Sequence, residues 1–237
     1  MDAIERTLAS FDGGRVLDVA TLEGRFVGIL MENLRSYTEI VGIDISERAI
    51  EAANEKLGSG DVRFLVMDGA KLDFEDESFD TVCIAASLHH MENPDEVLGE
   101  MKRVLKRGGR FIVLEMHRDI ETEAERTSSL MHGWAAEIDT ALGRVHKPTL
   151  TADEIRRHVA RLGLDEVRVA ESVDRDSDPL EEGKLEMLQG VIERVSKRVP
   201  GIEGSEGLLR RGDELARRVR EVGAQSEPLL LIAGRKR

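Results

Sequence analysis

Three aspartates end three short apolar segments that the sequence predicts as strands. Asp18 follows Val16-Leu17, Asp44 ends Val41-Gly42-Ile43-Asp44, and Asp68 ends Phe64-Leu65-Val66-Met67-Asp68. A carboxylate in such a place accepts hydrogen bonds, and an acid about twenty residues beyond a first strand can accept both ribose hydroxyls of a nucleotide. The carboxyl ends of parallel strands meet in one crevice, so the three acids together indicate a ligand with several donors.

The turn after the first strand reads Ala20-Thr21-Leu22-Glu23-Gly24 and leads into a helix. A strand, a tight turn and a helix N-terminus form the nucleotide-binding corner of this architecture. Only Gly24 remains of a glycine-rich loop. Taken by itself, the turn is explained equally well as an ordinary connection between a strand and a helix.

A second group of candidate residues lies further along the chain, where His132, Asp139 and His146 occur within fifteen residues. On a helix, His132 and Asp139 are two turns apart and share a face. Such a group can act as a general base or bind a divalent metal. The spacing matches no closed metal motif, so we assign no metal ligands from the sequence. The alternative is a charged amphipathic helix with a purely structural role.

The elements that would position these residues alternate between strand and helix. Strands are predicted over 15–20, 39–43, 62–67, 79–85 and 110–115, and helices over 24–34, 46–57 and 94–105, the last ending at Gly108-Gly109. This alternation is typical of a doubly wound α/β fold, with a parallel sheet covered on both faces. After Glu115 we expect helices over 122–142 (as one or two), 151–162, 185–198 and 206–222, and strands over 166–170 and 228–233.

The first half of the chain resembles the class I S-adenosylmethionine-dependent methyltransferases, close to the group of quinone-biosynthesis C-methyltransferases and small-molecule methyltransferases. The matching motifs follow the family order: residues 16–20 with Gly24, then 41–46, 67–70, 79–90 and 98–111. The resemblance implies a Rossmann-like, seven-stranded sheet of order 3-2-1-4-5-7-6, with an antiparallel last strand and helical lid insertions. We expect a single domain over 1–237: a cofactor-binding half over 1–115, lid segments over 116–163 and 180–224, and the last strand over 228–234.

The resemblance also implies S-adenosylmethionine as cofactor, S-adenosylhomocysteine as product, and the cofactor-binding residues. The loop of Asp18, Ala20, Thr21 and Gly24 would cradle the methionine part, Asp44 would hold the ribose, Ile45 would pack on the adenine, Asp68 and Gly69 would bind the adenine edge, and Ala85 would border the cofactor.

A small-molecule acceptor would lie above strands one, four and five and take the methyl group by in-line displacement. The candidate catalytic residues are His132, His146, Asp139 and His89, which follows the fourth strand, while His117 lies just past the fifth.

The main departure from the family pattern is Leu22, which stands where a central glycine is expected, and Ala20 replaces the first glycine. A catalytically silent protein that serves as a binding or regulatory subunit is therefore the alternative. A nicotinamide-dependent oxidoreductase would need a G-x-G-x-x-G turn, which is absent. A nucleic-acid methyltransferase would carry an Asn-Pro-Pro-Tyr-type element after the fourth strand, and none is present.

The composition limits which classes of binding partner and which location we expect. A formal net charge of −13 repels phosphate backbones and anionic membrane surfaces, so we expect no nucleic-acid partner. The single cysteine, Cys83, cannot form an internal disulfide, and we interpret it as a buried apolar side chain. The sequence shows neither a signal peptide nor a membrane span, so we expect a cytoplasmic location. The helices over 185–198 and 206–222 are a candidate surface for a homodimer.

Overall fold

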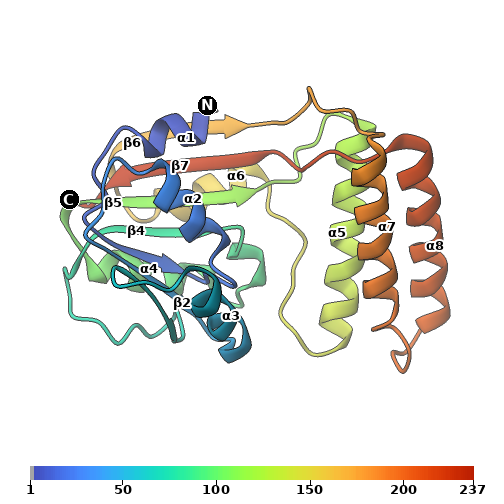
Figure 1. Cartoon of the computed structure of the whole chain (residues 1–237), viewed down its shortest axis with the longest axis horizontal. Helices are drawn as coiled ribbons and strands as arrows, with labels where there is room; N and C mark the ends of the chain where they lie inside the picture. The colour runs from blue at the N-terminus through green and yellow to red at the C-terminus, as the bar shows by residue number, and fades with distance from the viewer. Residues whose placement is uncertain (1–2) are drawn as a thin grey trace.

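A seven-stranded sheet of order β3-β2-β1-β4-β5-β7-β6 organises the protein in the computed structural model (Figure 1). The structure describes residues 3–237, so the first two residues of the predicted domain lie outside it. Strands β1 to β5 are parallel, and β7 runs antiparallel to both β5 and β6, which confirms the predicted order. The strands are β1 (Arg15–Val19), β2 (Glu39–Asp44), β3 (Val62–Val66), β4 (Phe79–Ala85), β5 (Leu105–Met116), β6 (Asp165–Ser172) and β7 (Leu229–Arg235).

Alternating side chains of the central strands enter two separate cores, one on each face of the sheet. Val16, Cys83 and Ile112 pack under helices α1 to α3, whereas Leu17 and Val82 pack under α4 and α6. Cys83 is fully buried, as predicted. The helices are α1 (Ala3–Leu8), α2 (Arg25–Asn33), α3 (Glu47–Leu57), the 3-10 turn η1 (Leu88–His90), α4 (Pro94–Val104), α5 (Glu123–Ala141), α6 (Ala152–Ala160), α7 (Glu182–Ser196) and α8 (Ser205–Val222).

Two capping boxes fix where α5 and α6 begin. The side chain of Thr122 accepts from Glu125 N at 3.0 Å, and that of Thr151 accepts from Glu154 N at 3.1 Å, while each glutamate bonds back to the cap. These boxes satisfy N–H groups that the first helical turn leaves unpaired. The segment predicted as one or two helices is therefore a single helix, α5.

One predicted boundary is wrong. The Gly108-Gly109 pair does not end a helix, because α4 ends at Val104 and the pair lies inside β5, where the register against β4 shifts. Gly108 takes a left-handed φ of 72° there, and such an irregularity suits glycine. Helix α6, which lies in the segment 116–163 predicted as a lid, packs Ile155 and Val159 into the core of the sheet.

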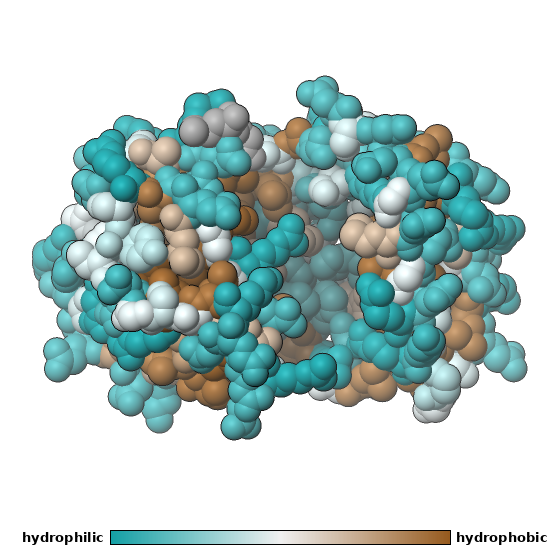
Figure 2. Space-filling view, in the orientation of Figure 1, coloured by the Kyte–Doolittle hydropathy of each residue, from teal (hydrophilic) through white to brown (hydrophobic). Residues whose placement is uncertain are grey.

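Helices α5, α7 and α8 form a separate layer beyond the carboxyl ends of the parallel strands (Figure 1). Their core contains Trp134, which is 1% exposed and donates its indole N–H to Leu208 O at 2.9 Å. In space-filling view the molecule is hollowed between the sheet and this layer (Figure 2). Among residues 3–237, no helix combines the length and the apolar character that a bilayer crossing requires.

Candidate functional site

The turn after β1 keeps the backbone shape of a glycine-rich loop although two of its residues are not glycine. Ala20, Leu22 and Gly24 have φ values of 57°, 50° and 78°, so every second residue is left-handed. The loop is held by Thr21 N, which donates to Ile43 O at 2.8 Å. A left-handed backbone costs roughly 1–2 kcal/mol for a residue with a Cβ, so Ala20 and Leu22 keep this shape against their own preference.

Asp44 lies at the end of β2 and faces this loop. One carboxylate oxygen accepts from Leu22 N at 3.0 Å and the other from Ser46 N at 2.9 Å. Each oxygen retains a second lone pair, so the pair of oxygens can accept two further donors. Next to it, the side chain of Ile45 is 75% exposed, an unusual position for a large apolar residue unless a ligand covers it.

Asp18 is a buried carboxylate with the side chains of Thr21 and Cys83 beside it. Its side chain is 1% exposed, and neither carboxylate oxygen has a hydrogen-bond partner in the described part of the chain. Burial, helped by the nearby charge of Asp44, raises the pKa of Asp18 to about 7. Buried polar groups are normally paired, so Asp18 is a group that a bound ligand would satisfy.

The remaining predicted cofactor residues lie at the same edge of the sheet. Asp68 is exposed, and its carboxylate accepts from Ala70 N at 2.9 Å. Gly69 lies so close to β1 that a Cβ there would come within 2.8 Å of Val19 Cγ1. Ala85 ends β4. Together with the loop and Asp44, these residues offer donors, acceptors and an apolar surface that fit a nucleoside ligand.

Four histidines gather beside this edge. His89 and His90 belong to η1, directly after β4, whereas His132 lies on α5 and His146 in the loop that follows α5. Ring centroids are 4.9 Å apart for His89 and His132, 4.9 Å for His132 and His146, and 4.1 Å for His90 and His146. Three of the four predicted catalytic residues therefore meet here.

Each of three rings has a carboxylate near its Nδ1 atom. Nδ1 of His146 donates to Asp139 Oδ2 at 2.8 Å, so the fourth predicted catalytic residue also joins the cluster. The corresponding distances are 3.3 Å from His89 to Glu115 Oε1 and 3.9 Å from His132 to Glu227 Oε2. A carboxylate on one nitrogen fixes the tautomer and turns the lone pair of the other nitrogen outward.

Two imidazoles of this cluster, those of His132 and His90, are neutral at pH 7. Burial, reinforced by the neighbouring histidines, lowers the pKa of His132 to about 3 and that of His90 to about 4. A neutral imidazole presents one lone pair, which can accept a proton or bind a cation.

Glu115 and Glu227 were not identified from the sequence. Glu115 is fully buried and accepts from the backbone N–H groups of Ser87 and Leu88 at 2.9 and 2.7 Å, which holds η1 in place. The available signal was an acid that ends the apolar run Phe111-Ile112-Val113-Leu114. Glu227 precedes β7, and no pattern in its neighbours points to the histidines.

His117, the remaining histidine named from the sequence near the expected pocket, lies outside the cluster. It contacts Glu171 Oε1 of β6 at 3.1 Å.

The segment that leads into the cluster touches the loop after β1. Ser87 Oγ contacts the carbonyl oxygens of Ala85 and Ala20 at 2.7 and 3.4 Å.

The comparison with known proteins agrees with this geometry. Residues 10–161 match the model of the methyltransferase domain family, which is more than half of the chain. The chain belongs to the class I S-adenosylmethionine-dependent methyltransferases. The cofactor of this methyltransferase is S-adenosylmethionine, and S-adenosylhomocysteine is the corresponding product.

Relatives of this methyltransferase differ in what they act on. A demethylmenaquinone methyltransferase of Thermotoga maritima is 38% identical over 102 residues, which covers 43% of each chain. A 27-O-demethylrifamycin SV methyltransferase of Amycolatopsis mediterranei is 29% identical over 196 residues, covering 79% of this chain and 66% of the relative. The chain spans about half the length of most curated relatives that it matches. A solved structure from Bacillus halodurans, assigned as a methyltransferase, has a TM-score of 0.63 at 17% identity and covers 99% of this chain and 97% of its own.

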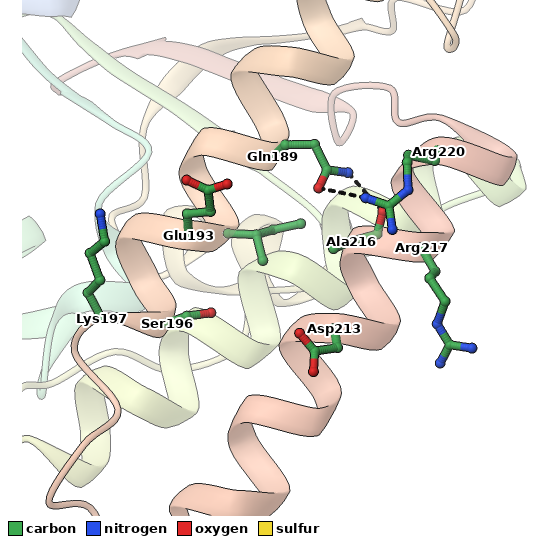
Figure 3. Close-up of a pocket in the computed structure, with 9 residues that line it drawn as sticks. Gln189, Glu193, Ser196, Lys197, Asp213, Ala216, Arg217 and Arg220 are labelled. Atoms are coloured by element: carbon green, nitrogen blue, oxygen red, sulfur yellow. Dashed lines mark hydrogen bonds between the residues drawn. The ribbon is translucent and has the colours of Figure 1, made fainter.

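A groove of about 640 Å³ lies elsewhere, between α7 and α8 (Figure 3). Its side chains bond across it: Gln189 donates to Ala216 O at 2.8 Å and accepts from Arg220 at 3.1 Å. None of the predicted site residues lines it. Homodimer formation through α7 and α8 stays a prediction.

Proposed function

We propose that this methyltransferase methylates a small molecule bound between the carboxyl ends of β1, β4 and β5 and the inner face of α5. The observation that carries this proposal is the contact of Ser87 Oγ with Ala20 O at 3.4 Å, because Ser87 lies only two residues before His89 of the histidine cluster. The acceptor would thus meet the imidazoles on one side and the cofactor on the other. The net charge of −13 makes a nucleic-acid acceptor unfavourable.

When bound, S-adenosylmethionine supplies a methyl group on a sulfonium, which an acceptor takes by in-line displacement. The chain's own residues then have to hold the two ligands in line and remove a proton from an acceptor that carries one. In our proposal Asp18 and the loop through Ala20, Thr21 and Gly24 hold the methionine part. Asp44 accepts from the ribose, Ile45 covers the adenine, Asp68 and Gly69 bind its edge, and Ala85 borders the cofactor.

His146 is the residue that we propose as general base. Asp139 holds its Nδ1–H, so the Nε2 lone pair is directed into the cluster. His132 and His89 line the same space and would orient the acceptor. This arrangement favours an acceptor with an ionisable hydroxyl group. The relatives described above are named for demethylmenaquinone and for 27-O-demethylrifamycin SV, so both names give a small-molecule acceptor.

Calorimetry with S-adenosylmethionine and S-adenosylhomocysteine tests the cofactor part. We expect saturable binding to the wild type and its loss in Asp44→Ala, because two ribose hydroxyls would lose their acceptor. Asp153→Ala is the matched control, since Asp153 is an exposed acid in the first turn of α6. If neither ligand binds the wild type, the proposed methyl transfer is overturned and the catalytically silent alternative is favoured.

A further inference from the structure

Nitrogen atoms of His89, His132 and His146, one from each ring, all lie within 4.8 Å of one another. We propose that these three histidines bind a divalent transition-metal ion of the Zn²⁺ or Co²⁺ type. The binding site lies within the acceptor-side cluster, so its role in catalysis rests on the proposed function, whereas metal binding itself does not.

The geometry of the cluster is close to that of a metal site. Nε2 of His132 and Nε2 of His146 are 3.0 Å apart. Ligands of a tetrahedral zinc ion at about 2.0–2.1 Å lie roughly 3.4 Å from each other, so these two nitrogens are already at nearly the right separation. The ligand nitrogen of His89 lies within 4.8 Å of the other two, so it has to approach them by up to about 1.4 Å to reach the separation in a tetrahedral site.

His89 has an unsatisfied buried side chain aimed into this cluster. It is 1% exposed, and neither ring nitrogen has a hydrogen-bond partner that meets the usual geometric criteria within residues 3–237. A buried imidazole without partners is costly, and a bound cation would satisfy its lone pair. Its ring lies 4.9 Å from that of His132 and 5.7 Å from that of His146.

Carboxylates lie where they could orient the metal-binding imidazoles. A metal-binding imidazole usually donates its other N–H to a carboxylate, a carbonyl oxygen or water. Asp139 does so for His146 at 2.8 Å, Glu115 lies 3.3 Å from His89, and Glu227 lies 3.9 Å from His132. With Nδ1–H directed to Asp139, Nε2 of His146 accepts the hydrogen bond of 3.0 Å that joins it to Nε2 of His132. A cation that displaces the proton between these two nitrogens would be bound by both.

The donor set selects the class of ion. Three imidazole nitrogens suit zinc, cobalt, nickel or ferrous iron, whereas magnesium and calcium require oxygen ligands. Three protein ligands also leave a coordination position for an oxygen atom of a further ligand. Coordination there would polarise a hydroxylated acceptor, and Nε2 of His146 would then be a metal ligand instead of a base.

The ligands come from two layers of the molecule. His89 follows β4 of the sheet, whereas His132 belongs to α5 of the helical layer. An ion bound by both would connect the two layers. Metal binding should therefore raise the unfolding temperature as well as produce a spectroscopic signal.

The test uses untagged, full-length protein, treated with a chelator and then titrated with Zn²⁺ in a calorimeter and with Co²⁺ in an absorption spectrometer. We expect one ion per chain, the visible d–d bands of four-coordinate cobalt, and a higher unfolding temperature. Separate His132→Ala and His146→Ala variants should lose these signals, and Asp139→Asn should weaken affinity by about 10- to 100-fold. These variants avoid His89, whose burial makes its replacement a risk to folding.

His158→Ala is the matched control, because His158 is a surface histidine that contacts Asp95 and lies outside the cluster. It should bind both ions like the wild type. The proposal is overturned if the wild type binds no stoichiometric ion, or if His132→Ala and His146→Ala remain folded by circular dichroism and bind as tightly as the wild type. Calorimetry with S-adenosylmethionine on the same preparations separates the two ideas. Cofactor binding without metal binding rejects only the metal site, and metal binding without cofactor binding rejects only the proposed function.

Discussion

Nδ1 of His146 lies 2.8 Å from Oδ2 of Asp139, across the turn that ends α5. Asp139 also pairs with Arg144 at 3.0 Å and with Arg198, so its carboxylate is fixed from three sides. A carboxylate held in this way orients the imidazole more firmly than one free to rotate. The pair thereby links the end of α5 to the residue that we propose as general base.

Replacing Asp139 by asparagine should separate catalysis from cofactor binding. The amide cannot hold the imidazole in the same tautomer with the same strength, so we expect methyl transfer to fall by about 10- to 100-fold or more. The measurement is S-adenosylhomocysteine release with a panel of hydroxylated acceptors, alongside calorimetry with S-adenosylmethionine. Unchanged cofactor affinity is expected, and a comparable loss of that affinity would instead place Asp139 in the cofactor site.

Asp18 should make the unfolding free energy depend on pH. Its folded pKa is raised to about 7 from 3.8, so the folded protein binds the extra proton between these values. The stabilising contribution is present in full below about pH 4 and is lost as pH rises through about 7. Between pH 5 and pH 8 we expect the wild type to lose about 3 kcal/mol more than Asp18→Asn, which cannot titrate. Urea denaturation of the ligand-free proteins measures this, and parallel pH profiles would contradict it.

Leu22→Gly should stabilise the protein. Leu22 has a φ of 50°, and this left-handed conformation costs the folded protein roughly 1–2 kcal/mol. Glycine removes that cost but loses about 0.5–1 kcal/mol through the greater chain entropy of its unfolded state, which is less. We expect a net gain of about 0.5–1 kcal/mol in thermal or urea unfolding. Leu22→Ala is the control, because it removes the side chain but retains the strain and should give no gain. Equal stability of the two variants would show that the loop is not strained at this position.

Two glycines of α8 allow a controlled test of how tightly the helical layer is packed. A Cβ on Gly212 would lie 2.8 Å from Trp134 Cζ2, whereas a Cβ on Gly207 would meet nothing within 4 Å. Gly212→Ala should destabilise the protein by about 1–3 kcal/mol through overpacking. Gly207→Ala should stabilise it by up to about 1 kcal/mol through helix propensity. Differential scanning calorimetry distinguishes them, and a stable Gly212→Ala variant would mean that Trp134 can move aside.

The cofactor edge could be predicted from the sequence because its signals are local. Asp18 and Asp44 each end an apolar run, and the strand order follows from the resemblance to a family. The backbone of Leu22 was not predictable in this way, since a leucine gives no indication of a left-handed conformation. Here the hydrogen bond from Leu22 N to Asp44 prevails over the residue's own preference.

The acceptor side could be predicted only in part. His132, Asp139 and His146 are close in sequence, and their meeting follows from helix geometry and one turn. His89 and Glu115 also lie at the histidine cluster, but they belong to segments at the ends of other strands. Glu227 lies there too, just before β7, which runs in the opposite direction. Such contacts depend on how the helical layer is placed over the sheet, and that placement is set by packing between distant segments.

The helical layer has a core of its own around Trp134 and joins the sheet through four connecting segments, at 117–122, 142–151, 173–181 and 223–228. Selection can therefore alter the two parts at different rates. Substitutions that reshape α5, α7 and α8 need not disturb the loop after β1 or the acids that end β1 and β2. A lineage of such proteins can acquire new substrates while it inherits one unchanged methyl donor, and the histidines at the junction would then be the first positions to diverge.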